Sequence, residues 1–314
     1  MNNPIQPSQT KERKPRLPRY RRAIKSQIPQ MLIQGRDIEI LKTIWEYRYL
    51  TSEHFLYLIK GSRQKIYQRL QKLFHNRYLH RLHFPIRLDT GGSSPAIYVL
   101  DHLGADLLVE HTGLPVEKVK WTNSIKTVES RYLKHALMIS NFRAVLSLAI
   151  QKHPNLRLVW SQGKAIKDKV LGDQKGDKRE NIAIIPDAYF KIIDIKKLGG
   201  EEADHFFLEC DRATAPSKRF QKRMRGYWIY WGRGRGKFSE KYGSPHFRIL
   251  TVTTSEKRTK TLLKATQKAD DSQTGSRLYL FTEEMKYSLN EPEKLLGEIW
   301  RTARTPGKIE GMLS

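Results

Sequence analysis

The first periodic pattern of hydrophobic residues runs over residues 36–81 and predicts three helices. Apolar residues recur every three or four positions over residues 36–50, which is the spacing of one buried helical face. Thr51 and Ser62 are suited to cap a short second helix and a longer third helix. The third helix is amphipathic, with the apolar residues Ile66, Leu70, Leu73 and Phe74.

A hairpin pattern follows the third helix. Two strand-like runs, residues 78–88 and 96–100, flank the turn sequence "DTGGSSP". Three helices followed by a hairpin are the order of a winged helix, in which the third helix enters the major groove of DNA. We therefore expect a winged-helix domain at residues 34–111, preceded by a disordered basic arm at 1–33 and followed by a linker at 112–128.

The pattern over residues 129–314 changes to strands that alternate with helices. A long helix comes first, and the strand-like runs "LRLVWSQ", "IAIIPDAYFKI", "HFFLECD", "HFRILTVTT" and "RLYLFT" follow it. Helical patterns separate the later strands at residues 215–231 and 255–269. This alternation predicts an α/β domain with a mixed sheet, so the fold class is a winged helix followed by an α+β or α/β domain.

The net charge of the chain indicates a nucleic-acid partner. The 314 residues include 58 Lys and Arg against 32 Asp and Glu, a formal net charge of +26. Such an excess favours a polyanion, and double-stranded DNA is the expected partner. Residues 62–81 carry six Lys or Arg and no acid, although a polar helix face can also be merely solvated. The candidate DNA contacts are Arg63, Gln64, Lys65, Gln68, Arg69 and Lys72.

Cysteine content and hydropathy exclude other classes. Cys210 is the only cysteine, which excludes an internal disulfide and a zinc site built from cysteines. No apolar run approaches the roughly 18 residues of a membrane span, and no apolar segment follows the basic N-terminus. We therefore expect a cytoplasmic protein without a membrane partner.

Acidic residues stand at the ends of two predicted buried strands. Asp187 follows a proline in the run 182–192, and Glu209 and Asp211 end the run 205–211. Carboxylates brought together on neighbouring strands raise one another's pKa, and a divalent cation relieves that repulsion. Mg²⁺ favours one or two carboxylates together with substrate phosphates, so Mg²⁺ or Mn²⁺ is the candidate cofactor. The alternative is a structural ion network in which these acids pair with Arg212, Arg219 or Lys222.

The order of these segments resembles the PD-(D/E)xK nuclease core. That resemblance implies that Asp187 and Glu209 bind the metal, with Glu129 as a further acid from the first helix. The sequence departs from the pattern because Asp211 occupies the position of the catalytic lysine. Some members of the superfamily place that lysine on the next helix, which points to Lys218 or Lys222. The candidate catalytic residues are Asp187, Glu209, Asp211 and Lys222.

The chain as a whole resembles the replication-relaxation family of bacterial plasmids, which is related to MobC-type mobilisation relaxases. The resemblance spans about residues 34–255 and includes "PDAYF", "FFLECDRAT" and "KRMRGYWIYW". It implies a protein that binds an origin-like DNA site and relaxes it by metal-dependent nicking. The alternative is a non-catalytic regulator or replication accessory factor with a degenerate nuclease fold. A homodimer and a single-stranded DNA ligand are further expectations. Tyr227, Trp228, Tyr230 and Trp231 could stack on unpaired bases, although we expect at least half of these four residues to belong to the core.

Overall fold

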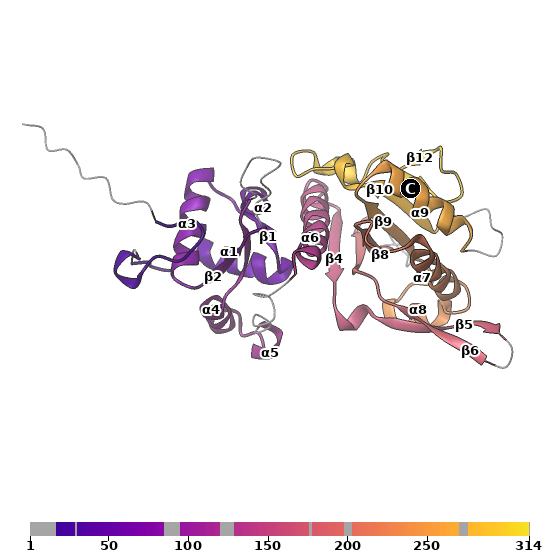
Figure 1. The fold of residues 1–314 in the computed structure, drawn as a ribbon, viewed down its shortest axis with the longest axis horizontal. Helices are drawn as coiled ribbons and strands as arrows, with labels where there is room; N and C mark the ends of the chain where they lie inside the picture. Colours follow the sequence, from indigo (N-terminus) through magenta and orange to yellow (C-terminus); the bar gives the residue numbers. More distant parts are fainter. Residues whose placement is uncertain are drawn as a thin grey trace, which may run out of the picture. The chain divides into compact units, whose positions relative to one another are not determined.

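The computed structural model describes residues 17–28, 30–84, 95–119, 129–175, 178–197, 203–269 and 276–313. The chain divides into two compact units. Unit 1 comprises Met1–Glu46 and Gly61–Lys126, and unit 2 comprises Tyr47–Lys60 and Thr127–Ser314. Figure 1 shows the elements of both units. Residues 47–60, which the sequence pattern placed in the N-terminal domain, belong to unit 2 because the helix they form packs on the long helix after residue 129.

Unit 1 has the first and third helices and the hairpin strands that the sequence pattern predicts, whereas the predicted second helix belongs to unit 2. Ile66, Leu70 and Leu73 are fully buried in the third predicted helix, whose N-cap is Ser62. The predicted turn of the hairpin lies outside the described residues, whereas its two strands pair antiparallel. The elements of unit 1 are η1 (Lys25–Gln27), α1 (Gly35–Tyr47), α3 (Arg63–His75), β2 (Leu79–Leu82), β3 (Ile97–Leu100), α4 (His102–Thr112) and α5 (Val116–Val119).

The segment before α1 is part of this folded unit. Arg22 donates hydrogen bonds to the carbonyl oxygens of Phe74 and Leu79, both at 3.0 Å. Its guanidinium also forms an ion pair of 2.5 Å with the buried carboxylate of Asp101. The expected disordered arm therefore does not extend to residues 17–28, because one arginine ties them to α3 and β2; residues 1–16 lie outside the described part of the chain.

Unit 2 is built around a seven-stranded mixed sheet with the order β12-β11-β10-β9-β8-β7-β4. The three middle strands β8, β9 and β10 are parallel, and the outer pairs are antiparallel. The strands are β4 (Leu156–Ser161), β7 (Ala188–Asp194), β8 (Ala203–Asp211), β9 (Arg248–Thr253), β10 (Tyr279–Glu283), β11 (Trp300–Thr302) and β12 (Ile309–Glu310). A separate antiparallel hairpin joins β5 (Asp168–Lys175) to β6 (Lys178–Ile184).

Alternating aromatic residues give this sheet two apolar faces. Phe190 of β7 packs against Phe142 of the helix on one face, with ring centroids 5.9 Å apart. Phe207 of β8 faces the other way and packs against Tyr227, with centroids 5.6 Å apart. Figure 1 shows α6 beside the sheet on one side and α7 and α9 on the other. The helices of unit 2 are α2 (Ser52–Leu58), α6 (Ser130–Gln151), α7 (Ser217–Trp231), α8 (Arg235–Tyr242) and α9 (Glu256–Gln267).

The β5–β6 hairpin packs closely on α7. The hairpin strand β6 lies against α7 at Gly226, where a Cβ atom would come within 2.7 Å of Ile182. A larger residue at this position would therefore push the hairpin away from α7.

Helix α6 is long and apolar enough to cross a membrane by length and composition. However, 56% of that apolar window is buried inside the protein, as in the core helix of a soluble domain.

Candidate functional site

Strand β8 separates its acidic residues from its cysteine by simple alternation. Glu209 and Asp211 lie two positions apart and therefore point to the same face of the sheet, which α7 and α9 cover. Cys210 lies between them and is buried. Its backbone N–H donates a hydrogen bond of 2.7 Å to Oδ2 of Asp187 at the start of β7. The pairing of β7 with β8 thus brings the three sequence-predicted acids to one edge of the sheet.

Glu209 is a buried carboxylate with partners on α7. Its side chain is 1% exposed, and the hydroxyl of Tyr227 donates a hydrogen bond of 2.7 Å to Oε1. Arg223 donates to Oε2 from the same helix face, one turn before Tyr227. Burial, opposed by the charge of Arg223 and reinforced by that of Asp187, raises the pKa of Glu209 from 4.5 to about 7. The partners therefore compensate the buried charge only in part.

Asp187 is bound by a histidine of α6. Nε2 of His135 in α6 lies 3.2 Å from Oδ2 of Asp187 and 3.1 Å from the carbonyl oxygen of Cys210. Burial alone would lower the pKa of His135, but the hydrogen bond and charge of Asp187 outweigh it, so the pKa is raised. A lone histidine inside a long apolar helix gives no sequence signal for this role, because its partner lies 52 residues away, just before β7.

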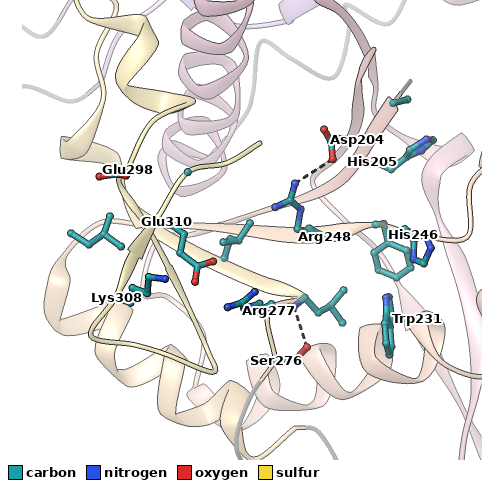
Figure 2. Close-up of a pocket in the computed structure, with 16 residues that line it drawn as sticks. Asp204, His205, Trp231, His246, Arg248, Ser276, Arg277, Glu298, Lys308 and Glu310 are labelled. Carbon is teal, nitrogen blue, oxygen red and sulfur yellow. Dashed lines mark hydrogen bonds and ion pairs between the residues drawn. The ribbon is translucent and has the colours of Figure 1, made fainter. Parts of the chain in front are cut away.

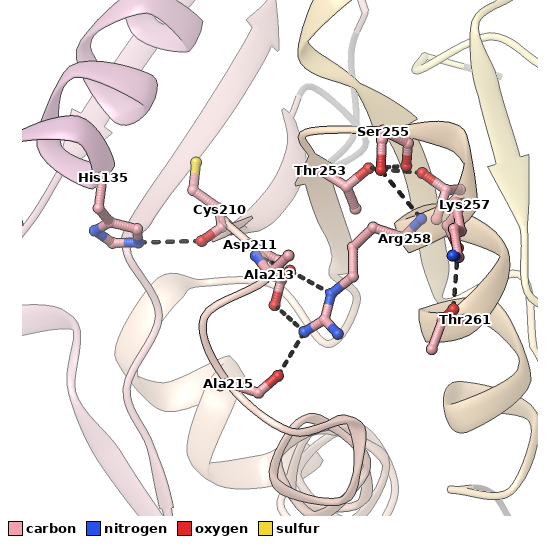
Figure 3. Close-up of polar contacts among 11 residues, drawn as sticks. His135, Cys210, Asp211, Ala213, Ala215, Thr253, Ser255, Lys257, Arg258 and Thr261 are labelled. Atoms are coloured by element: carbon pink, nitrogen blue, oxygen red, sulfur yellow. Dashed lines mark hydrogen bonds and ion pairs between the residues drawn. The ribbon is translucent and has the colours of Figure 1, made fainter. Parts of the chain in front are cut away.

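Asp211 is engaged by an arginine of α9. Nε and one terminal nitrogen of Arg258 donate to its two oxygens at 2.7 and 2.9 Å, a bidentate pair (Figure 3). The same guanidinium donates to the carbonyl of Ala215 at 2.8 Å, and the N–H of Ala213 donates to Asp211 at 2.8 Å. Asp211 therefore fixes the loop that leads into α7, including Ala213 at a positive φ of 58°. Among the described residues, the side chain of Asp211 accepts hydrogen bonds from Arg258 and Ala213 and has none to Asp187 or Glu209.

A pocket of about 830 Å³ opens beside Asp187 and Asp211. Lys222, the predicted catalytic lysine, lines this pocket and forms an ion pair of 2.5 Å with Glu180 of the hairpin. Glu209 is contacted by the neighbouring Arg223 instead. Glu129, the further acid considered from sequence, is exposed and also lines the pocket. Among the described residues, no group of three or more His, Cys, Asp or Glu is arranged to bind a metal ion. Several cations line the pocket: Arg131, Arg212, Arg219, Lys222 and Arg223.

The predicted DNA-contacting residues of α3 divide into two groups. Arg69 is buried and binds the fully buried Asp37 of α1 with two donor groups, so it faces the core of unit 1. It also donates to the carbonyl oxygen of Leu32 at 3.0 Å. Lys72 is half-buried. The exposed residues of the predicted set are Arg63, Gln64, Lys65 and Gln68.

The aromatic cluster of α7 also divides. Tyr227 and Tyr230 are fully buried in the core between α7 and the sheet. Trp228 and Trp231 are only partly buried and stack on each other, with ring centroids 5.6 Å apart. Only the two tryptophans therefore have surface that a ligand could reach.

The family comparison agrees with the resemblance found in the sequence. The sequence model of the family described as replication-relaxation matches residues 41–244. That range includes α3, Asp187, Glu209 and α7, and it ends before β9. Searches of curated proteins and of solved structures found no match.

Proposed function

Because the chain belongs to the replication-relaxation family, we propose that it is a cytoplasmic DNA-binding protein that acts in the replication or mobilisation of a plasmid or another mobile element. The observation that carries this proposal is the exposed face of α3, where Arg63 and Lys65 lie beside two glutamines and no acid. Arginine, lysine and glutamine are the side chains that contact phosphates and purine edges in the major groove.

The order of α1, α2, α3, β2 and β3 along the chain supports a winged-helix mode of binding, with α2 contributed by the segment that belongs to unit 2. Helix α3 is followed directly by the antiparallel strands β2 and β3, and its apolar side is fixed in the core by Ile66 and Leu70. The buried pair of Arg69 and Asp37 joins α3 to α1. A recognition helix supported in this way keeps its polar face in a fixed orientation, which sequence-directed binding to an origin-like site requires.

Replacing Arg63 and Lys65 together with alanine should weaken binding to DNA. Because both side chains are exposed, the fold should be unaffected, and each lost phosphate contact should reduce the slope of log affinity against log salt by about 0.9. The measurement is fluorescence anisotropy with duplex DNA from the origin region over a range of salt. Lys264→Ala, on the exposed side of α9, is the matched control and should leave the slope unchanged. Equal slopes for all three proteins would contradict the proposed role of α3.

In unit 2, the order of α6, three antiparallel strands, α7 and the parallel strand β9 supports a PD-(D/E)xK-like scaffold. The acids do not fit a metal site in the arrangement described. Both oxygens of Glu209 accept bonds from Tyr227 and Arg223, and both oxygens of Asp211 accept bonds from Arg258. Arg223 stays protonated at all physiological pH values, so it cannot act as the general base that a lysine could supply. These pairs favour a non-catalytic scaffold.

Metal-dependent nicking is the second candidate, and one observation favours it. Oδ2 of Asp187 accepts a hydrogen bond of 2.7 Å from the N–H of Cys210, the residue after Glu209, and the charge of Asp187 helps to raise the pKa of Glu209. Mg²⁺ or Mn²⁺ would relieve this charge repulsion if Arg223 exchanged Glu209 for a DNA phosphate. The pocket cations Arg219 and Lys222 would then contact the DNA backbone.

A plasmid assay separates the two candidates. For a non-catalytic scaffold, supercoiled plasmid carrying the origin region should stay supercoiled with Mg²⁺ or Mn²⁺, for the wild type and for Asp187→Ala alike. The measurement is gel electrophoresis of topoisomers, with random-sequence plasmid as the substrate control. Open circles formed by the wild type and lost in Asp187→Ala would establish nicking and contradict the non-catalytic scaffold.

A further inference from the structure

A second pocket of unit 2 lies where the parallel strands β8, β9 and β10 begin. Its volume is about 720 Å³, within the range of small-molecule sites, and most of its lining follows residue 244, where the family match ends. Figure 2 shows its two sides and the arginines between them. Trp231 and His246 lie on one side, Lys308 and Glu310 on the other, and Arg248 and Arg277 between.

Glu310 gives this pocket an unused acceptor. Its Oε1 atom is buried and accepts no hydrogen bond from any described residue. A buried carboxylate oxygen without a donor costs free energy, which a ligand that offers an N–H group would recover. The backbone of Glu310 pairs with Trp300 of β11, so the position of its side chain is set by the sheet.

The cations of the pocket differ in their availability. Arg248 is partly buried and forms an ion pair of 3.3 Å with Asp204 (Figure 2). Arg277 and Lys308 are exposed at the opening of the pocket. Two exposed cations at one opening attract an anionic group such as a phosphate, whereas Arg248 already interacts with the carboxylates of Asp204 and Glu310.

Trp231 supplies an aromatic wall. It is partly buried, stacks on Trp228 at an interplanar angle of 26°, and lines the pocket together with the buried Phe247. Aromatic side chains at the edge of a basic groove are the surfaces on which unpaired bases stack. An N–H acceptor, exposed cations and an aromatic wall therefore occur together in one pocket.

We propose that this pocket binds one unpaired nucleotide of single-stranded DNA and prefers guanine. The base packs against Trp231, its N1–H and N2–H groups donate to the carboxylate of Glu310, and Arg277 and Lys308 contact the adjacent phosphates. Thymine offers a single N–H between two carbonyl oxygens, which the carboxylate repels. The inference rests on the proposed DNA-binding function and adds to it a site for the strand exposed during replication or transfer.

The test compares two short labelled single strands, one all thymine and one with a single guanine, by fluorescence anisotropy. The wild type should bind the guanine strand about tenfold more tightly, since a hydrogen bond to a charged acceptor is lost with thymine. Glu310→Gln should remove this preference, because the amide offers one acceptor and one donor. Lys308→Ala should weaken binding to both strands equally, and the matched control Glu298→Gln, an exposed carboxylate of the same pocket, should keep the preference.

Equal affinity of the wild type for both strands would overturn the proposal, as would a preference that persists in Glu310→Gln or disappears in Glu298→Gln. Duplex binding measured in parallel separates this failure from failure of the proposed function. If duplex DNA binds normally and guanine is not preferred, only the pocket assignment is wrong. If no DNA binds, the proposed function fails as well. Unchanged duplex binding by Glu310→Gln shows that this variant is folded.

Discussion

Asp37→Ala should destabilise unit 1 by about 4 kcal/mol, because removal of one partner from a buried ion pair leaves the other charge uncompensated. Asp37 is fully buried and Arg69 is 8% exposed. The aspartate accepts two bonds from Arg69 and a third, of 2.8 Å, from the backbone N–H of Gln34. The measurement is chemical denaturation of the full chain, monitored through a signal that comes from unit 1. The affinity for DNA should fall in parallel.

Two companion variants show whether the effect comes from the buried charge. Glu39→Ala removes an exposed carboxylate from the same helix and should change the unfolding free energy by less than about 0.5 kcal/mol. The double variant Asp37→Leu with Arg69→Met replaces the pair by apolar groups and should recover most of the loss. If Asp37→Ala lowered the unfolding free energy no more than Glu39→Ala does, the Asp37–Arg69 ion pair would not stabilise unit 1.

Arg69 illustrates which part of the site the sequence could predict. The helix around it followed from the spacing of Ile66, Leu70 and Leu73, which the structure confirms as buried. Arg69 lies at the border between this apolar side and the polar side, where spacing alone cannot say which way a long side chain turns. Its orientation is decided by Asp37, which is 32 residues away in the sequence. Local pattern therefore predicted the helix but not the partner of its arginine.

For the acids of unit 2, too, the local pattern predicted the secondary structure but not the partners of the side chains. The strands and their order in the chain were predictable from apolar runs, and so was the convergence of Asp187, Glu209 and Asp211 near one sheet edge. Their partners were not, because Arg223 and Arg258 are selected by the rotation of α7 and α9 against the sheet. Arg223 and Tyr227 share a helix face four residues apart, whereas Lys222 is turned about 100° away and reaches the hairpin instead.

Glu209→Gln should stabilise the protein above neutral pH and flatten its pH dependence. The pKa of Glu209 is raised from 4.5 to about 7 in the folded state, so the folded protein binds this proton more tightly than the unfolded chain. Stability from this group is fully present below about pH 4.5 and is lost as the pH rises through about 7. Between about pH 5 and about pH 8, the unfolding free energy of the wild type should fall by on the order of 2 kcal/mol relative to that of the glutamine variant.

The test is denaturation of both proteins over this pH range, with His135→Gln as a third variant. His135 also has a raised pKa and lies beside Asp187. Its contribution to the stability of the folded protein therefore also falls as the pH rises. Comparison of the three proteins separates the two groups. Parallel pH profiles for wild type and Glu209→Gln would contradict the raised pKa. Stabilisation of the wild type by Mg²⁺ near pH 8, absent in Glu209→Gln, would show instead that Glu209 exchanges Arg223 for the metal, because a carboxylate binds Mg²⁺ much better than a neutral amide does.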